Sequence, residues 1–69
     1  MADEDNKLYF ISFCIEQYKT SHNMEGSKVA NLFNKKGVSD YLEDNYNVLH
    51  TQSADWLVAD IDDFLKQRR

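Results

Sequence analysis

The segment LYFISFCIEQYK, residues 8–19, limits the possible folds of this chain more than any other feature. Of its first eleven residues, eight are apolar. When each residue is stepped by 100° around a helix axis, only Ser12, Glu16 and Lys19 form a polar wedge, and that wedge is narrow. A helix that is apolar around most of its circumference is expected to be buried. Either the remaining chain wraps around it, or a second copy covers one flank.

Three aromatic residues extend the apolar surface of this helix past its inner side. Leaving Phe10 and Phe13 in water would forfeit about 1.5–3 kcal/mol each, a large share of the roughly 3–5 kcal/mol that a small core supplies. The chain has a single cysteine, so no internal disulfide can compensate. We therefore predict a homodimer formed through Tyr9, Phe10 and Phe13. The inner side is expected to hold Leu8, Ile11, Cys14, Ile15 and Tyr18.

The rest of the chain also has a helical pattern. There is no proline, and Gly26 and Gly37 are the only glycines, which permits long helices. Apolar residues recur at helical spacing, and charged residues near the expected helix ends suit the helix dipoles. The sequence therefore predicts an all-α fold, a compact four-helix domain over residues 1–69 in which residues 1–4 are disordered. The expected helices lie near residues 5–20, 27–36, 39–49 and 54–67.

Local signals mark the expected helix ends. Ser27, Ser39 and Ser53 are good N-caps for the last three helices. Gly37 suits the left-handed conformation that ends the second helix. The caps, the periodicity and the charges agree with one another, and such agreement across levels is the best support that a sequence offers for a fold.

The C-terminal half of the chain presents an acidic surface. The formal net charge is −4, and no Lys or Arg occurs between Gly37 and Leu65. Nucleic-acid binding depends largely on Lys and Arg, so this surface argues against a nucleic-acid partner and favours a basic protein partner. The alternative is that these carboxylates are only a solvated face that keeps a small domain soluble.

Trp56 is expected to project from the last helix between Asp60 and Asp63. A tryptophan in such a place is typical of an interface anchor, although it can also fold back over the third helix as the edge of the core. Tyr41 and Tyr46 raise the same two alternatives. The predicted partner-binding residues are Glu43, Asp44, Tyr46, Trp56, Asp60 and Asp63.

No residue pattern indicates catalysis. His50 could act as a general base or a pH switch, but a lone histidine carries little catalytic information, and the simpler interpretation is a polar residue that ties down a turn. Cys14 lies in an apolar stretch that disfavours its thiolate. Asp60, Asp62 and Asp63 lack the glycine turn and the further oxygen ligands of a calcium loop. We predict no enzyme activity, no cofactor and no metal site.

A helix-turn-helix regulator is the alternative function. The segment KVANLFNKKGVSDYLEDNY, residues 28–46, places a glycine turn between two expected helices, as in DNA-binding proteins of that type. Its alanine-to-glycine spacing is longer than usual, and its second helix is acidic, which phosphates would repel. Such a regulator would depend on Lys28, Lys35 and Lys36.

The start of the chain bears on location. Residues 1–7 are acidic and polar, and they lack the basic start and the apolar run of a secretory signal. No entirely apolar run is longer than that from Leu8 to Ile11, which is far shorter than the ~20 residues that span a bilayer. We expect no membrane association and, given the single cysteine, a cytoplasmic location.

The segments FISFCIEQYK, LFNKKGVSDYLEDNY, LHTQS and DIDDFL together resemble a family of short bacterial proteins of unknown function. The resemblance covers roughly residues 8–65, and its most specific motifs are Phe-Cys-Ile-Glu-x-Tyr-Lys and Leu-His-Thr. It implies a cytoplasmic bacterial protein with no established activity and no catalytic residues. Some relatives are encoded beside ADP-ribosyltransferase-like proteins, which suits an antitoxin or immunity role.

Overall fold

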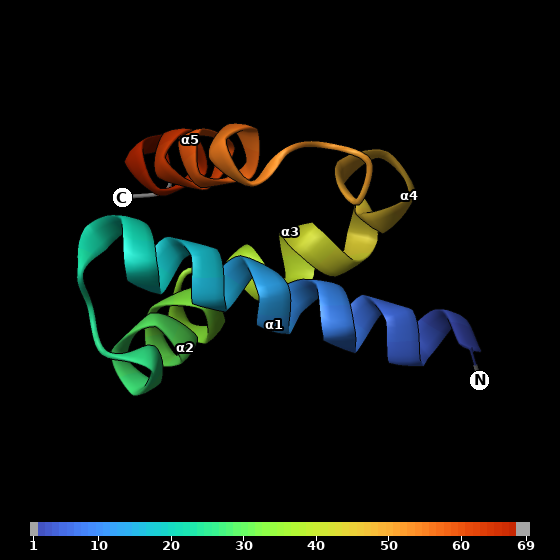
Figure 1. Ribbon diagram of the computed structural model, residues 1–69, viewed down its shortest axis with the longest axis horizontal. Coiled ribbons are helices and arrows are strands. Elements are labelled where there is room, and N and C mark those ends of the chain that lie inside the picture. The colour runs from blue at the N-terminus through green and yellow to red at the C-terminus, as the bar shows by residue number, and fades with distance from the viewer. Residues whose placement is uncertain (1, 68–69) are drawn as a thin grey trace.

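The computed structural model describes residues 2–67, which form five helices and no strand. They are α1 (Ala2–His22), α2 (Gly26–Lys35), α3 (Val38–Asp44), α4 (Tyr46–Leu49) and α5 (Ala54–Gln67). The first helix runs along the long axis of the molecule, with α5 above it, α2 below it and α3 behind it in the view of Figure 1. The radius of gyration, 11.2 Å, matches the ~11 Å expected of a compact chain of this length. The predicted all-α fold is therefore confirmed.

Helix α1 is longer than predicted at both ends. It begins at Ala2, so residues 2–4, which we expected to be disordered, are helical. Met1 lies outside the described residues. The helix ends at His22 and is followed by Asn23 in a left-handed conformation with φ +53°. No proline or glycine interrupts the N-terminal stretch, and its acidic character is favourable in a first helical turn.

The helix predicted over residues 39–49 is interrupted, so residues 2–67 contain five helices where we predicted four. Asn45 lies between α3 and α4 with φ −112° and ψ 22°. Its Nδ2 donates a hydrogen bond to the Tyr41 carbonyl at 2.9 Å, and the same oxygen accepts the Asn45 backbone N–H at 3.1 Å. Asparagine side chains compete with the helix backbone in this way, and the spacing of apolar residues does not reveal it.

Two of the three predicted N-caps are wrong. Helices α2 and α3 each begin one residue before the predicted cap, so Ser27 and Ser39 lie inside helices, and neither N-terminus has a side-chain cap hydrogen bond. Ser53 is the correct prediction, because its Oγ accepts the Trp56 backbone N–H at 3.2 Å. Accordingly, α5 spans the predicted residues 54–67.

Gly37 separates α2 from α3 in the left-handed conformation, with φ +78°, as predicted. A Cβ there would meet nothing within 4 Å, so alanine would add only conformational strain. We expect Gly37→Ala to lower the free energy of unfolding by about 1–2 kcal/mol in urea denaturation. Gly26→Ala is the control, because a Cβ at Gly26 would make an ordinary 3.7 Å contact with Lys19 Cδ. Equal losses for the two variants would contradict the backbone explanation.

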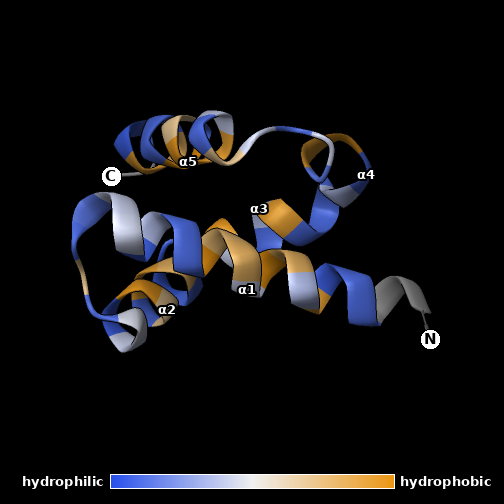
Figure 2. Cartoon of the chain, viewed as in Figure 1, coloured by the Kyte–Doolittle hydropathy of each residue, from blue (hydrophilic) through white to orange (hydrophobic). Residues whose placement is uncertain are grey.

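Two predictions for α1 are wrong: Phe10 is buried in the core, and Leu8 is exposed. The buried face of α1 holds Phe10, Cys14 and Tyr18, which are at most 7 % exposed, whereas Leu8 is 64 % exposed. Phe10, predicted for self-association, packs edge-on against the Tyr46 ring at 5.5 Å within one copy. Figure 2 shows apolar colouring through the middle turns of α1, so its neighbours and not its own periodicity select the buried face. The described core comprises Phe10, Cys14, Tyr18, Val29, Phe33, Val38, Leu42, Leu49, Leu57 and Ile61.

Candidate interaction surfaces

Trp56 and Asp63 lie on the outside of α5. Seven residues separate them, nearly two helical turns, so the two side chains share one face. The Trp56 side chain is 44 % exposed, and Asp63 is exposed as well. Because less than half of Trp56 is exposed, this value fits an accessible interface anchor and also the alternative in which Trp56 forms the edge of the core. We call Trp56 and Asp63 the α5 surface.

Asp60 takes part in an internal contact between α3 and α5. The Tyr41 hydroxyl donates a hydrogen bond to Asp60 Oδ2 at 2.7 Å, and the Tyr41 ring stacks on Phe64 with 4.6 Å between ring centroids. Burial, together with the hydrogen bond to Asp60 and its charge, raises the pKa of Tyr41 to about 12. Asp60 is half-buried, and its Oδ2 already accepts the hydrogen bond that joins α3 to α5. It is therefore less available to a partner than an exposed carboxylate.

Tyr46 and His50 form a second internal contact. Tyr46 is half-buried between Phe10 and His50, and its ring stacks on the His50 imidazole at 4.5 Å. The His50 Nδ1 lies 2.7 Å from the Tyr46 carbonyl oxygen. A carbonyl only accepts, so Nδ1 carries the proton in this hydrogen bond. This arrangement agrees with the simpler interpretation of His50, a residue that ties down the end of α4.

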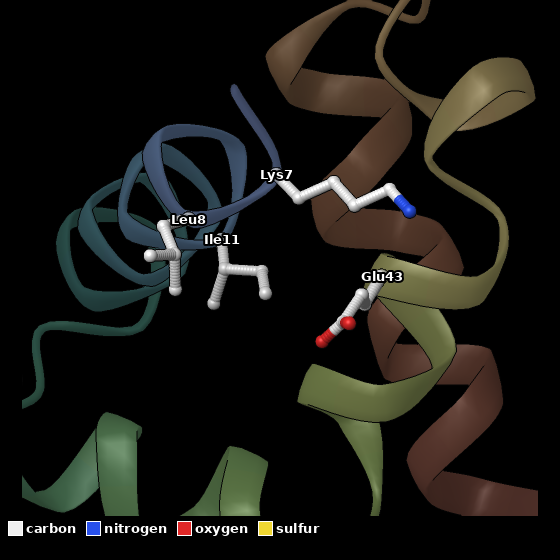
Figure 3. Close-up of a pocket in the computed structure, with 4 residues that line it drawn as sticks. All are labelled: Lys7, Leu8, Ile11 and Glu43. Atoms are coloured by element: carbon white, nitrogen blue, oxygen red, sulfur yellow. The ribbon is translucent and has the colours of Figure 1, made fainter. Parts of the chain in front are cut away.

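Glu43 faces α1 and not the α5 surface. It lines a hollow of about 220 Å³ together with Lys7, Leu8 and Ile11, and Figure 3 shows Leu8 and Ile11 on one side of the opening and Glu43 on the other, with Lys7 extending toward the Glu43 side. The hollow is smaller than the ~300–1,000 Å³ typical of ligand pockets. Asp44 is exposed on α3. Of the six predicted partner-binding residues, Glu43 thus lines this hollow, Tyr46 and Asp60 make internal contacts, and Asp44, Trp56 and Asp63 are exposed.

The outer side of α1 carries three of the five large apolar residues that are exposed in the described part of the chain. Leu8, Tyr9 and Phe13 are 64 %, 78 % and 38 % exposed. Tyr9 and Phe13 were predicted for self-association, and both remain accessible in one copy. Leu8 was missed, because the sequence pattern placed it on the inner side. The same side of α1 includes Ser12 and Glu16, which line a shallow depression with Tyr9 and Phe13.

A cluster that the sequence did not reveal fastens the end of α1 to α5. The Tyr18 hydroxyl donates to Asp62 Oδ1 at 2.9 Å, and His22 Nε2 lies 3.1 Å from Asp62 Oδ2. The His22 ring also stacks on Tyr18 at 4.2 Å. Burial first, and then the hydrogen bond and charge of Asp62, raise the pKa of Tyr18 to about 12. These partners lie 44 and 40 positions apart in sequence, so no local pattern links them.

The described residues offer little for chemistry. Cys14 is 1 % exposed, and burial raises the pKa of its thiol to about 12, so the thiol stays neutral and is a poor nucleophile. Within residues 5–67, no three His, Cys, Asp or Glu side chains are grouped closely enough to hold a metal ion. None of the described helices has the length and apolar character that crossing a bilayer requires.

Helices α2 and α3 follow one another across Gly37, as a helix-turn-helix unit would. However, α3 has only seven residues, and it carries exposed carboxylates at Asp40, Glu43 and Asp44. Phosphate contacts come mainly from Lys and Arg, so α3 is poorly suited to enter a DNA groove. No feature of the described residues favours this alternative.

The chain is similar to one protein family. The family described as "Protein of unknown function (DUF3791)" matches residues 9–68. No curated protein and no solved structure is significantly similar to the chain. The family match agrees with the resemblance to an uncharacterised family, and it assigns no activity.

Proposed function

The chain belongs to the DUF3791 family of unknown function, and we propose that it is a non-catalytic protein-interaction module that binds a basic protein partner at the α5 surface. The observation that carries this proposal is Trp56, which is 44 % exposed on the same side of α5 as the exposed Asp63. Tryptophan is enriched among the residues that dominate binding energy, because a partner can desolvate its large ring.

The charge of the surrounding chain defines the partner. From Gly37 to Leu65 there is no Lys or Arg, and Asp44, Asp55 and Asp63 are exposed. A field of one sign attracts a partner of the opposite sign and repels others. Glu43, Tyr46 and Asp60 contribute less than we predicted from the sequence, because Glu43 faces α1 and the other two are engaged internally.

The first test uses the native host. The immobilised domain should capture a basic protein from a lysate of the organism that encodes it, and Trp56→Ala should weaken this capture by about tenfold or more, as expected for an anchoring tryptophan. Val48→Ala is the matched control, because Val48 is 66 % exposed on α4 but lies outside the proposed surface. Undiminished capture by Trp56→Ala would refute the assignment.

Trp56 also provides a direct signal, since it is the only tryptophan. Its fluorescence should change when the purified partner is added, and the change should weaken as salt screens the charges. Asp63→Asn should reduce the affinity while leaving the circular dichroism spectrum unchanged. A fluorescence spectrum that does not respond to a bound partner would place the binding site elsewhere.

We further propose that the partner is a toxin or effector, so that the domain acts as an antitoxin or immunity protein in a bacterial cytoplasm. This finer proposal rests on the genomic neighbourhood that the resemblance implies and on the acidic field, which would cover a basic surface of such an enzyme. Identification of the captured protein tests it. A captured enzyme whose activity falls when the domain binds would support the role, and a captured structural protein would oppose it.

A further inference from the structure

The outer side of α1 suggests a second interface with a different occupant. We propose that two copies of this chain associate through their α1 helices, antiparallel, with the helices crossing at Ser12 and Phe13. Of the residues that we predicted for self-association, Tyr9 and Phe13 are available for this contact, because one copy leaves them 78 % and 38 % exposed. Phe10, which we first assigned to self-association, has no part in the contact because it belongs to the core. This face is separate from the α5 surface.

The charges on α1 identify a second copy as the occupant. Asp5 and Lys19 lie seven residues before and after Ser12, a distance of about 10 Å along the helix in each direction. Steps of seven residues keep all three side chains on one face. An antiparallel pair therefore brings Asp5 of each copy opposite Lys19 of the other, whereas a parallel pair would oppose like charges. Asp5 is exposed, and the Lys19 side chain is 38 % exposed.

The centre of this face suits close packing. Ser12 is small and exposed, so two helix backbones can approach each other at that point, with the two Phe13 rings side by side. Glu16 is 61 % exposed and already accepts a hydrogen bond from Lys19 at 2.8 Å. In the antiparallel pair, Glu16 lies opposite Tyr9 of the second copy, whose hydroxyl can donate to the carboxylate. A single helix face is smaller than the ~800 Å² per partner of a standard interface. We therefore expect a weak dimer that dissociates when the protein is diluted.

Cysteine crosslinking tests the crossing point. Glutathione disulfide should oxidise the Ser12→Cys variant to a covalent dimer, because the two introduced thiols face each other near the two-fold axis. Asn31→Cys is the control, since Asn31 is exposed on α2 and its thiols meet only by collision. We expect Ser12→Cys to crosslink at least about tenfold faster, since association raises the local thiol concentration. Cys14 does not compete, because it is 1 % exposed. Equal crosslinking rates would overturn the proposal.

Charge reversal tests the antiparallel orientation. Asp5→Lys and Lys19→Asp should each weaken dimerisation, by about fivefold or more, because each opposes like charges at both ends of the interface. The double variant restores both pairs and should return the dissociation constant close to that of the natural chain. Light scattering from micromolar to millimolar protein measures this constant. A mass of one chain throughout that range, or a double variant no better than the single variants, would refute the interface. Neither result bears on Trp56, so the two proposals fail independently.

Discussion

Replacing Phe33 by alanine should leave this chain largely unfolded at 25 °C. Phe33 is fully buried, and its ring packs edge-on against Tyr18 with 5.5 Å between centroids. Removing a buried phenylalanine ring costs about 3–5 kcal/mol, and a core of this size supplies only roughly 3–5 kcal/mol in total. The far-ultraviolet circular dichroism of Phe33→Ala should therefore lose most of its helical signal.

Two controls separate this core effect from a general intolerance to substitution. Phe33→Leu keeps much of the apolar volume, so it should stay folded with a lower urea midpoint. Phe13→Ala makes the same chemical change at a position that is 38 % exposed, and in dilute solution it should cost much less than Phe33→Ala. A Phe33→Ala protein with the urea midpoint of the natural chain would mean that α2 is not essential to the core.

Helix α5 was predictable because its signals are local. Ser53 caps its first turn through a hydrogen bond to Trp56, and its apolar residues repeat at helical spacing, so both its bounds and its buried face follow from sequence. The break at Asn45 is local too, but it depends on one side-chain hydrogen bond to Tyr41. Helix propensities differ too little between residues to forecast such a break.

The orientation of α1 was not predictable for a different reason. A helix that is apolar around most of its circumference has no preferred inner side of its own, so its neighbours decide. Tyr46 of α4 covers Phe10 and leaves Leu8 outside. The pattern could therefore predict that α1 contributes to the core, but it could not say which of its aromatic residues are buried there and which remain exposed.

The acidic residues of α5 show the same limit for the candidate site. Their sequence alone suggests one solvated face, yet Asp60 and Asp62 each accept a hydrogen bond from a tyrosine on another helix. Asp63, which follows them, is exposed. The hydrogen bonds from Tyr18 and Tyr41 decide which carboxylate stays available to a partner. Because these tyrosines are far from α5 in the sequence, the spacing of residues within α5 could not predict the contacts. The proposed partner surface is consequently smaller than the one predicted from charge and aromatic content.

The same two tyrosines should make the domain sensitive to alkali. The pKa values of Tyr18 and Tyr41 are about 12 in the folded chain, against an ordinary value of 10.0. Between those values the unfolded chain loses phenolic protons that the folded chain still holds, so unfolding becomes more favourable as pH rises. The stabilisation is complete below pH 10 and is lost as pH approaches 12. Cys14 adds to this loss from about pH 9, because burial raises the pKa of its thiol in the same direction. Urea midpoints measured over this range should fall steeply.

A Tyr18→Phe, Tyr41→Phe double variant isolates the tyrosine contribution. It loses two hydrogen bonds and should be less stable than the natural chain at neutral pH, but its stability should decline less between pH 10 and pH 12, because it no longer carries the two late-titrating phenols. The slope is therefore the decisive measurement, since lost packing or hydrogen bonding alone would lower the whole curve without flattening it. An exposed phenol supplies the control: Tyr9→Phe, at a side chain 78 % exposed, should retain the slope of the natural chain. Parallel curves for the double variant and the natural chain would show that burial and the contacts with Asp60 and Asp62 do not raise the pKa values of these phenols in the folded chain.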